Sequence, residues 1–170
     1  MNTKVTLEEL KSQMPFNIGK PNDGFAQYFS GKSFLEPLST EQVKIFNVTF
    51  ESGCRNNWHI HHASAGGGQL LCTAGEGWYQ EEGKPAVSLH EGSVVMIPAN
   101  AKHWHGAKKD SWFSHIAIEV PGENCKNEWC EPVSDEEYHK LYSRRFSLRS
   151  AASALIIGAA RSLGQQGDAL

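Results

Sequence analysis

Short runs of apolar residues, several of them alternating with polar residues, fill the middle of the chain. Glycine, proline and charged residues separate these runs, which lie at 43–50, 57–61, 69–73, 78–80, 87–89, 93–97, 102–106 and 112–120. Alternation with a period of two is typical of a strand that buries one face. Strands this close together leave no room for helical crossovers. The pattern therefore predicts an all-β protein, an antiparallel sandwich or small barrel.

The two ends of the chain follow other patterns. Residues 7–14 have the composition of a short polar helix, 17–24 that of a loop, and 25–35 that of an extended segment. Residues 134–163 favour a helix, because Ser134 and Glu137 have the spacing of a capping box. We expect an N-terminal extension at 1–40 that packs on the barrel or on a dimer partner, a barrel at 41–133, and a C-terminal helix and tail at 134–170.

Composition narrows the range of functions. The chain has 170 residues, of which 39% are hydrophobic and 21% charged, with a formal net charge of −3. These values are typical of a folded domain and argue against a nucleic-acid partner, which requires a basic surface. No apolar stretch is long enough to span a bilayer, and the first ten residues lack the apolar segment of a signal peptide. We therefore expect a cytoplasmic protein without a membrane partner.

Histidine is the residue whose distribution points to chemistry, since seven of the eight histidines lie between positions 59 and 115. In a strand, His59 and His61 point to the same face. His103 and His105 repeat this arrangement. Two imidazoles on one face can chelate a metal ion, although paired surface histidines have the same spacing. Gln69 follows three glycines at the start of a strand, so its amide oxygen is either a further ligand or exposed to water.

These residues carry a resemblance to a known family. The segment 53–75 resembles the first cupin motif, G-x5-H-x-H-x3,4-E-x6-G, and the segment 92–103 resembles the second, G-x5-P-x-G-x2-H-x3-N. The stretches 53–86, 97–107 and 114–119 are similar to small bacterial cupins of the carboxymuconolactone-decarboxylase-associated group and to manganese-dependent cupin hydroxynitrile lyases. The resemblance implies a cupin double-stranded β-helix, which is a jelly-roll barrel, and a homodimer.

Departures from the motifs bear on the site. Gln69 stands where the first motif has glutamate, and its gap from His61 is seven residues. Asn100 replaces the glycine of the second motif, and asparagine tolerates a left-handed backbone.

The resemblance also implies a set of site residues. One divalent transition metal ion (Mn, Fe, Ni, Co or Zn) would be held by His59, His61, Gln69 and His103. His115 would face the open metal position as a general acid or base, and a structural buried histidine is the alternative. His105 shares a face with His103 and either replaces it as a ligand or lies behind the ligands. Because all four ligands are neutral, the ion would keep its full charge and act as a strong electrophile.

Such a site favours reactions that develop negative charge beside the metal. We expect an enzyme that acts on a small polar metabolite by metal-assisted lyase or decarboxylase-type chemistry, with His115 as the general acid or base. Two alternatives stay open. One is an Fe-dependent dioxygenase, and the other is a non-enzymatic cupin that binds a small molecule.

Overall fold

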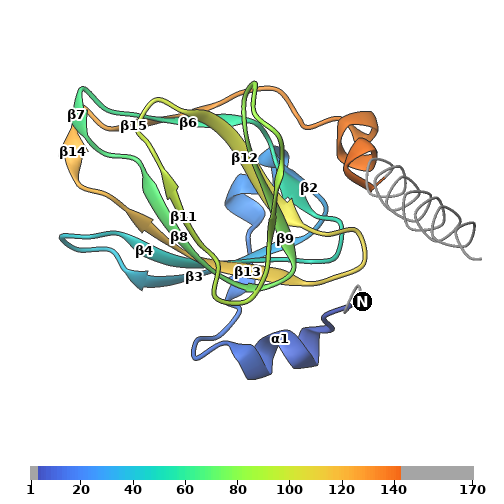
Figure 1. Cartoon of the computed structure of the whole chain (residues 1–170). Coiled ribbons are helices and arrows are strands. Elements are labelled where there is room, and N and C mark those ends of the chain that lie inside the picture. The colour runs from blue at the N-terminus through green and yellow to red at the C-terminus, as the bar shows by residue number, and fades with distance from the viewer. Residues whose placement is uncertain (1–3, 143–170) are drawn as a thin grey trace, which may run out of the picture. The chain divides into compact units, whose positions relative to one another are not determined.

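The computed structural model describes residues 4–142, and its internal contacts divide the chain between Val133 and Ser134. The first unit, up to Val133, holds all the β-strands labelled in Figure 1. Within the described range, no helix has the length and apolar character needed to cross a membrane.

One sheet of the first unit has six antiparallel strands in the order β1-β3-β4-β13-β8-β11. Its strands are β1 (Lys20–Pro21), β3 (Ser33–Ser39), β4 (Ile45–Phe50), β13 (Phe113–Glu119), β8 (Gln69–Gly75) and β11 (Val94–Ile97). The central strand β13 pairs with β4 on one side and with β8 on the other along nearly all its length. Late and early parts of the chain therefore lie side by side in this sheet.

The other large sheet has seven strands, with the path β10-β9-β12-β5-β2 and with β6 lying between β12 and β15. Its strands are β10 (Val87–Leu89), β9 (Gly77–Glu81), β12 (Lys102–Ala107), β5 (Arg55–Asn56), β2 (Phe29–Ser30), β6 (His59–His62) and β15 (Lys126–Trp129). A small third sheet joins β7 (Ala65–Gly66) to β14 (Gly122–Glu123). Figure 1 shows the two large sheets facing one another.

The hydrophobic core lies between the two large sheets. Both contribute buried side chains: Phe50, Leu71, Ile97, Phe113 and Ala117 from the first, and Tyr79, Leu89 and Ala107 from the second. Burial of a leucine or phenylalanine side chain contributes about 1.5–3 kcal/mol relative to exposure. Two antiparallel sheets closed over one core form a double-stranded β-helix, so the all-β jelly-roll barrel predicted from the sequence is confirmed.

The observed strands also test the predicted elements. Each of the eight predicted strands is present, with ends that differ by at most two residues. The expected extended segment at 25–35 is wrong at its start, because Asp23–Tyr28 form a 3-10 helix, η1. The following strands β2 and β3 pair with β5 and β4 of the same chain.

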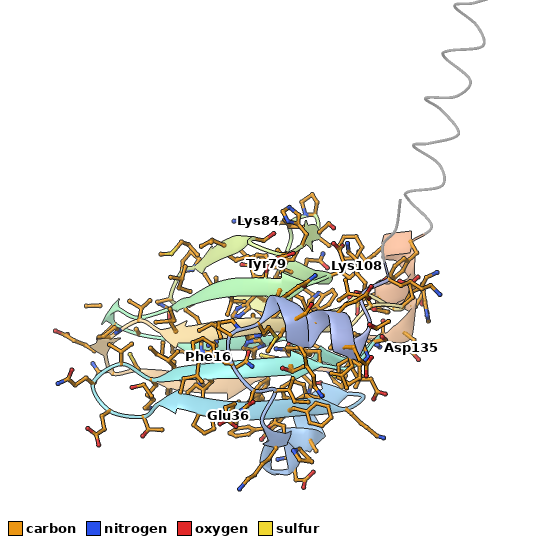
Figure 2. The ribbon with its side chains drawn as sticks, turned by 90° about the horizontal axis from the view of Figure 1, so that it is seen from below. Phe16, Glu36, Tyr79, Lys84, Lys108 and Asp135 are labelled. Atoms are coloured by element: carbon orange, nitrogen blue, oxygen red, sulfur yellow. The ribbon has the colours of Figure 1, made fainter. Side chains whose placement is uncertain are left out.

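Helix α1 (Leu7–Gln13) confirms the helix expected at 7–14. It begins at Thr6, whose hydroxyl accepts a hydrogen bond from the Glu9 N–H, while the Glu9 carboxylate accepts one from the Thr6 N–H. Its Leu10 is fully buried, and the Gln13 amide oxygen accepts the Gly75 N–H at 3.0 Å. Figure 2 shows α1 lying across the strands, outside the barrel interior.

The second unit is described only in its first residues. Residues 135–142 are helical, and the helix begins with the expected capping box. The Ser134 hydroxyl accepts the Glu137 N–H at 3.2 Å, and the Glu137 carboxylate accepts the Ser134 N–H at 3.0 Å. The rest of the helix expected at 134–163 lies outside the described residues.

Candidate metal centre

Two paired strands of the seven-stranded sheet carry the histidines. His59 and His61 come from β6, and His103 and His105 come from β12. His103 is the direct register partner of His59, so their side chains stand together on one face. Because side chains alternate along a strand, His61 and His105 share that face. Antiparallel pairing of β6 and β12 therefore unites the two His-x-His segments.

Three of these rings form a compact, buried group. One ring nitrogen from each of His59, His103 and His105 can be chosen such that the three atoms lie within 4.8 Å of one another. The ring centroids of His59 and His103 are 4.1 Å apart. The three residues are 3%, 0% and 4% exposed. Together these imidazoles could hold a metal ion.

The other two residues of the expected ligand set lie on the inner faces of the two sheets. The ring of His61 has its centroid 5.1 Å from that of His59 and 5.4 Å from that of His103. Gln69 begins β8 in the opposite sheet, is buried, and shares a strand face with the core residue Leu71. By nitrogen distances alone, the compact group contains His105 in place of His61.

Hydrogen bonds orient three of the rings. His59 donates from Nδ1 to the Asn57 carbonyl at 2.9 Å, and His103 donates from Nδ1 to the Ala101 carbonyl at 2.9 Å. His61 Nδ1 bonds to the Asn127 side-chain oxygen at 2.8 Å. Each of these bonds places the proton on Nδ1 and leaves the Nε2 lone pair available to a ligand or metal.

Buried nitrogens without partners point the same way. The Nε2 atoms of His61 and His103 are buried and have no hydrogen-bond partner among the described residues. A buried polar atom without a hydrogen-bond partner costs free energy, and binding of an ion at these nitrogens would offset that cost. Imidazole nitrogens that are free of protons and partners are suited to a divalent transition metal, and the donor set therefore fits such an ion.

Burial keeps the histidines neutral. Desolvation lowers the pKa of His59 well below its usual range, and the neighbouring His103 and His61 lower it further. Desolvation lowers the pKa of His103 to about 4 and also lowers the pKa of His61. The neutral imidazole is the form that binds a metal, so these rings need not release a proton first at neutral pH.

His105 has a different environment. The Asn56 side-chain amide nitrogen lies 3.3 Å from Nδ1 and 3.1 Å from Nε2 of His105. The same Asn56 accepts the His105 backbone N–H at 2.9 Å. Since an amide nitrogen donates, a lone pair of the His105 ring is already in use. Asn56 was not anticipated from the sequence, because its contact crosses from β5 to β12.

His115 lies deeper in the barrel, on β13. Its ring centroid is 4.6 Å from that of His105 in an edge-to-face arrangement and 5.5 Å from that of Phe50. The residue is 2% exposed, and neither ring nitrogen has a hydrogen-bond partner within the described range. Burial, with a contribution from His103, lowers the pKa of His115 to about 3. The ring is therefore neutral at physiological pH and open to a new partner.

Two flanking features hold the site in place. The Asn100 N–H donates to the His61 carbonyl at 2.8 Å, and Asn100 has the left-handed conformation expected of it, with φ 67°. Trp129 on β15 lies with its ring centroid 4.9 Å from that of His59 and stacks on Tyr28 at 4.5 Å. Neither β15 nor its Asn127 was expected as part of the site, because residues 126–129 show no apolar alternation.

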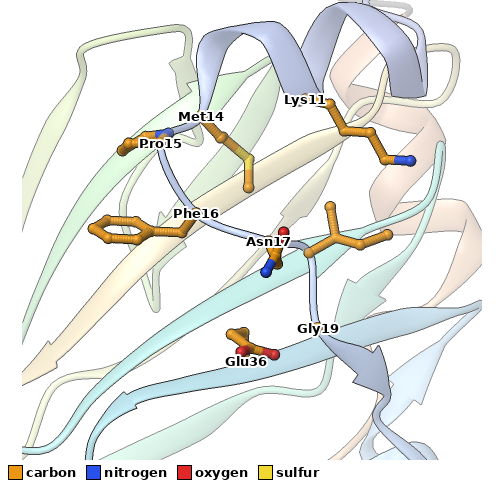
Figure 3. A pocket seen from close by; sticks show the side chains of 8 residues that line it. Lys11, Met14, Pro15, Phe16, Asn17, Gly19 and Glu36 are labelled. Atoms are coloured by element: carbon orange, nitrogen blue, oxygen red, sulfur yellow. The ribbon is translucent and has the colours of Figure 1, made fainter.

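His62 and one surface hollow lie apart from the histidine cluster. His62 points away from it and contacts Glu128 through Nε2 at 2.7 Å. A surface hollow of about 510 Å³ is lined by residues of the segment 14–19 together with Lys11 and Glu36 (Figure 3). No histidine lines this hollow, so it is separate from the candidate metal centre.

The fold and the site together define a class of protein. The class is a double-stranded β-helix whose interior presents a buried cluster of neutral imidazoles. No protein-family model matches the sequence. The chain nonetheless belongs to the cupin superfamily, as its relatives show.

The relatives are each similar to this chain over more than two thirds of its length. The chain is 37% identical over 121 residues to (R)-mandelonitrile lyase of Granulicella tundricola. The aligned region covers 69% of this chain and 90% of that protein. It is 35% identical to a cupin-like protein of Thermotoga maritima, with a TM-score of 0.63 over 75% of this chain and 96% of the other. A cupin 2 conserved barrel domain protein of Rhodopseudomonas palustris shares the fold at 12% identity, with a TM-score of 0.52 over 73% and 82% of the two chains.

Proposed function

We propose that the protein is a metal-dependent lyase that cleaves a small hydroxynitrile into a carbonyl compound and hydrogen cyanide. The observation that carries this proposal is the buried histidine cluster with partnerless Nε2 atoms at His61 and His103. The substrate class comes from the similarity to (R)-mandelonitrile lyase, whose name gives a hydroxynitrile as its substrate.

The proposed ligands are His59, His61, Gln69 and His103. Three of them have Nδ1 anchored to an oxygen, which frees Nε2 for a metal. His105 is not assigned as a ligand, because the Asn56 amide nitrogen already donates to a lone pair of its ring. We assign it to the residues that surround the ligands. When bound, a divalent ion would act as a Lewis acid that stabilises negative charge on oxygen or on departing cyanide.

His115 is the proposed general acid and base. Its neutral ring would accept the proton of the substrate hydroxyl while the bond to the nitrile carbon breaks and its electron pair leaves with cyanide. The hydroxyl carbon becomes the carbonyl carbon, and the proton on His115 then passes to cyanide. Burial among Phe50, Phe113 and His105 excludes water from this ring, and negative charge developing nearby favours its protonated form.

Cleavage of mandelonitrile tests the proposal. The Mn²⁺-loaded protein is expected to release benzaldehyde, followed by its ultraviolet absorbance. His115→Ala and the better-packed His115→Phe are expected to lower kcat by at least about 100-fold with unchanged metal content. His62→Ala removes a histidine from the same strand as two ligands but outside the cluster, and it should retain full activity.

Other outcomes would favour other functions. Full activity in both His115 variants would remove His115 from the reaction. Oxygen uptake with an Fe²⁺-loaded protein would support a dioxygenase. A folded protein that gains no thermal stability from Mn²⁺, Fe²⁺, Ni²⁺ or Zn²⁺ would support a non-enzymatic binding role.

A homodimer is also expected. Four apolar residues form a row of successive register partners across four strands of the six-stranded sheet: Ile45, Ile118, Leu70 and Met96. Met96 is 69% exposed and lies on β11, the edge strand of that sheet. An apolar row that ends at an open edge favours association with a second copy. Light scattering should give twice the mass of one chain, and a monomer mass would contradict this expectation.

A further inference from the structure

A carboxylate stands beside the proposed amide ligand. Glu119, at the end of β13, is the direct register partner of Gln69 at the start of β8. Residues directly opposite one another in an antiparallel pair have side chains on the same face, about 5 Å apart at Cβ. Since Gln69 shares its strand face with the core residue Leu71, Glu119 lies on the interior face at the end of the barrel that holds Gln69.

The contacts of Glu119 leave its charge effective toward the interior. Its carboxylate lies 3.6 Å from Lys44 Nζ, and its backbone N–H donates to the Lys44 carbonyl. The side chain of Lys44 is 61% exposed and that of Glu119 is 33% exposed, so water screens their pairing. The charge of Glu119 therefore acts mainly on groups at its own end of the barrel, where Gln69 lies directly opposite it.

We infer that Glu119 sets the charge preference of the site: it strengthens the binding of a divalent cation and weakens the binding of anions, so that neutral small molecules are the preferred substrates. This inference rests on the proposed function, because it assumes a cation at the histidine cluster. The proposed charge preference also distinguishes lyase chemistry from decarboxylase chemistry, both of which are compatible with the sequence. A hydroxynitrile is neutral, whereas the substrate of a decarboxylase is an anion.

The physical reason is the neutrality of the proposed ligands. Three imidazoles and one amide leave a dication uncompensated, so a nearby negative charge stabilises it through space. The same carboxylate repels an anion that approaches the ion. At the distances between neighbouring strands, and with screening near the surface, each effect is on the order of three- to tenfold in a dissociation constant.

A second carboxylate provides an internal comparison. Glu81 is the register partner of His103 on β9, but its carboxylate lies 2.7 Å from Lys84 Nζ. This closer pairing offsets more of its charge, so Glu81→Gln should change Mn²⁺ affinity less than Glu119→Gln. Glu36 lies on β3, paired with Asn47 and lining the outer hollow in Figure 3. Glu36→Gln is therefore the matched variant expected to change neither affinity.

The test measures two affinities in each variant. Mn²⁺ binding to metal-free protein is followed by calorimetry, and acetate binding to the Mn²⁺-loaded protein is followed by relaxation of the acetate methyl protons. In Glu119→Gln the Kd for Mn²⁺ should rise about three- to tenfold, while the Kd for acetate should fall by a similar factor. Glu119→Asp keeps the charge and should behave as the wild type.

Opposite changes in the two dissociation constants, a rise for Mn²⁺ and a fall for acetate, distinguish this electrostatic role of Glu119 from a structural one. If Glu119 only supported the fold, Glu119→Gln would weaken both ligands. That result, or no change in either affinity, would overturn the inference. If the wild type binds no Mn²⁺, or binds it no better than a His59→Ala/His61→Ala variant, the proposed function fails and the inference fails with it.

Discussion

Acidification of the metal-free protein is expected to destabilise it through His115. Burial lowers the pKa of this ring from its ordinary value of 6.5 to about 3. Between these two values the unfolded chain binds a proton that the folded protein does not. The contribution of the neutral His115 ring to the free energy of unfolding is therefore fully present above pH 6.5, and it is lost progressively as the pH falls toward 3.

The magnitude follows from the size of the shift. At pH 5, one and a half units below the ordinary value, His115 alone costs the folded state about 2 kcal/mol relative to pH 8. The variant His115→Phe removes the titrating group and keeps a ring beside Phe50 and Phe113. Its free energy of unfolding should therefore fall by about 2 kcal/mol less than that of the wild type between pH 8 and pH 5.

Urea unfolding in the presence of a chelator measures this difference. Val48 is the register partner of His115 on β4, and Val48→Ala should lower stability by the same amount at both pH values because it removes only packing. Equal pH dependence in the wild type and His115→Phe would refute the reasoning. It would mean that the buried ring gains a proton without penalty in the folded protein.

Two further changes test how the site is supported. Asn127→Ala removes the acceptor of His61 Nδ1 and should raise the Kd for Mn²⁺ about tenfold, as measured by calorimetry. Asn124→Ala removes a side-chain amide that donates to the Ser64 hydroxyl instead of to a histidine, and it should leave this Kd unchanged. Unchanged affinity in Asn127→Ala would argue against His61 as a ligand. Gly68→Ala should cost about 2 kcal/mol or more in thermal unfolding, because φ is +87° and a Cβ would collide with the carbonyl at the end of β11. Gly83→Ala has φ +74° but open space around it, so it should cost less, and equal losses would contradict the steric argument.

The strands of the barrel could be predicted because each carries a local signal. Alternation marks β4, and glycine or proline marks the turns beside β8 and β11. Strand β15 carries no such signal, since Lys126–Trp129 holds three polar residues and is in a sheet only because it pairs with β6. Helix η1 was likewise missed, because its six residues have a composition equally suited to an extended segment.

The site could be predicted only in part, for a similar reason. The His-x-His spacing placed His59 and His103 each on one face of a strand, together with the second histidine of its segment, and the observed pairing of β6 with β12 brings the two faces together. The same spacing applies to His61 and His105, so it could not say which ring comes nearest to the other two. Asn56 and Asn127 reach His105 and His61 from distant parts of the chain, and periodicity holds no information about such contacts.

Metal content tests the central claim most directly. The purified protein and a His59→Ala/His61→Ala variant should be compared by mass spectrometry for Mn, Fe, Ni, Co and Zn. We expect close to one divalent metal ion per chain in the native protein and its loss in the variant, because the variant removes two of the proposed imidazole ligands. A native protein that contains no metal, even after reconstitution, would contradict the account.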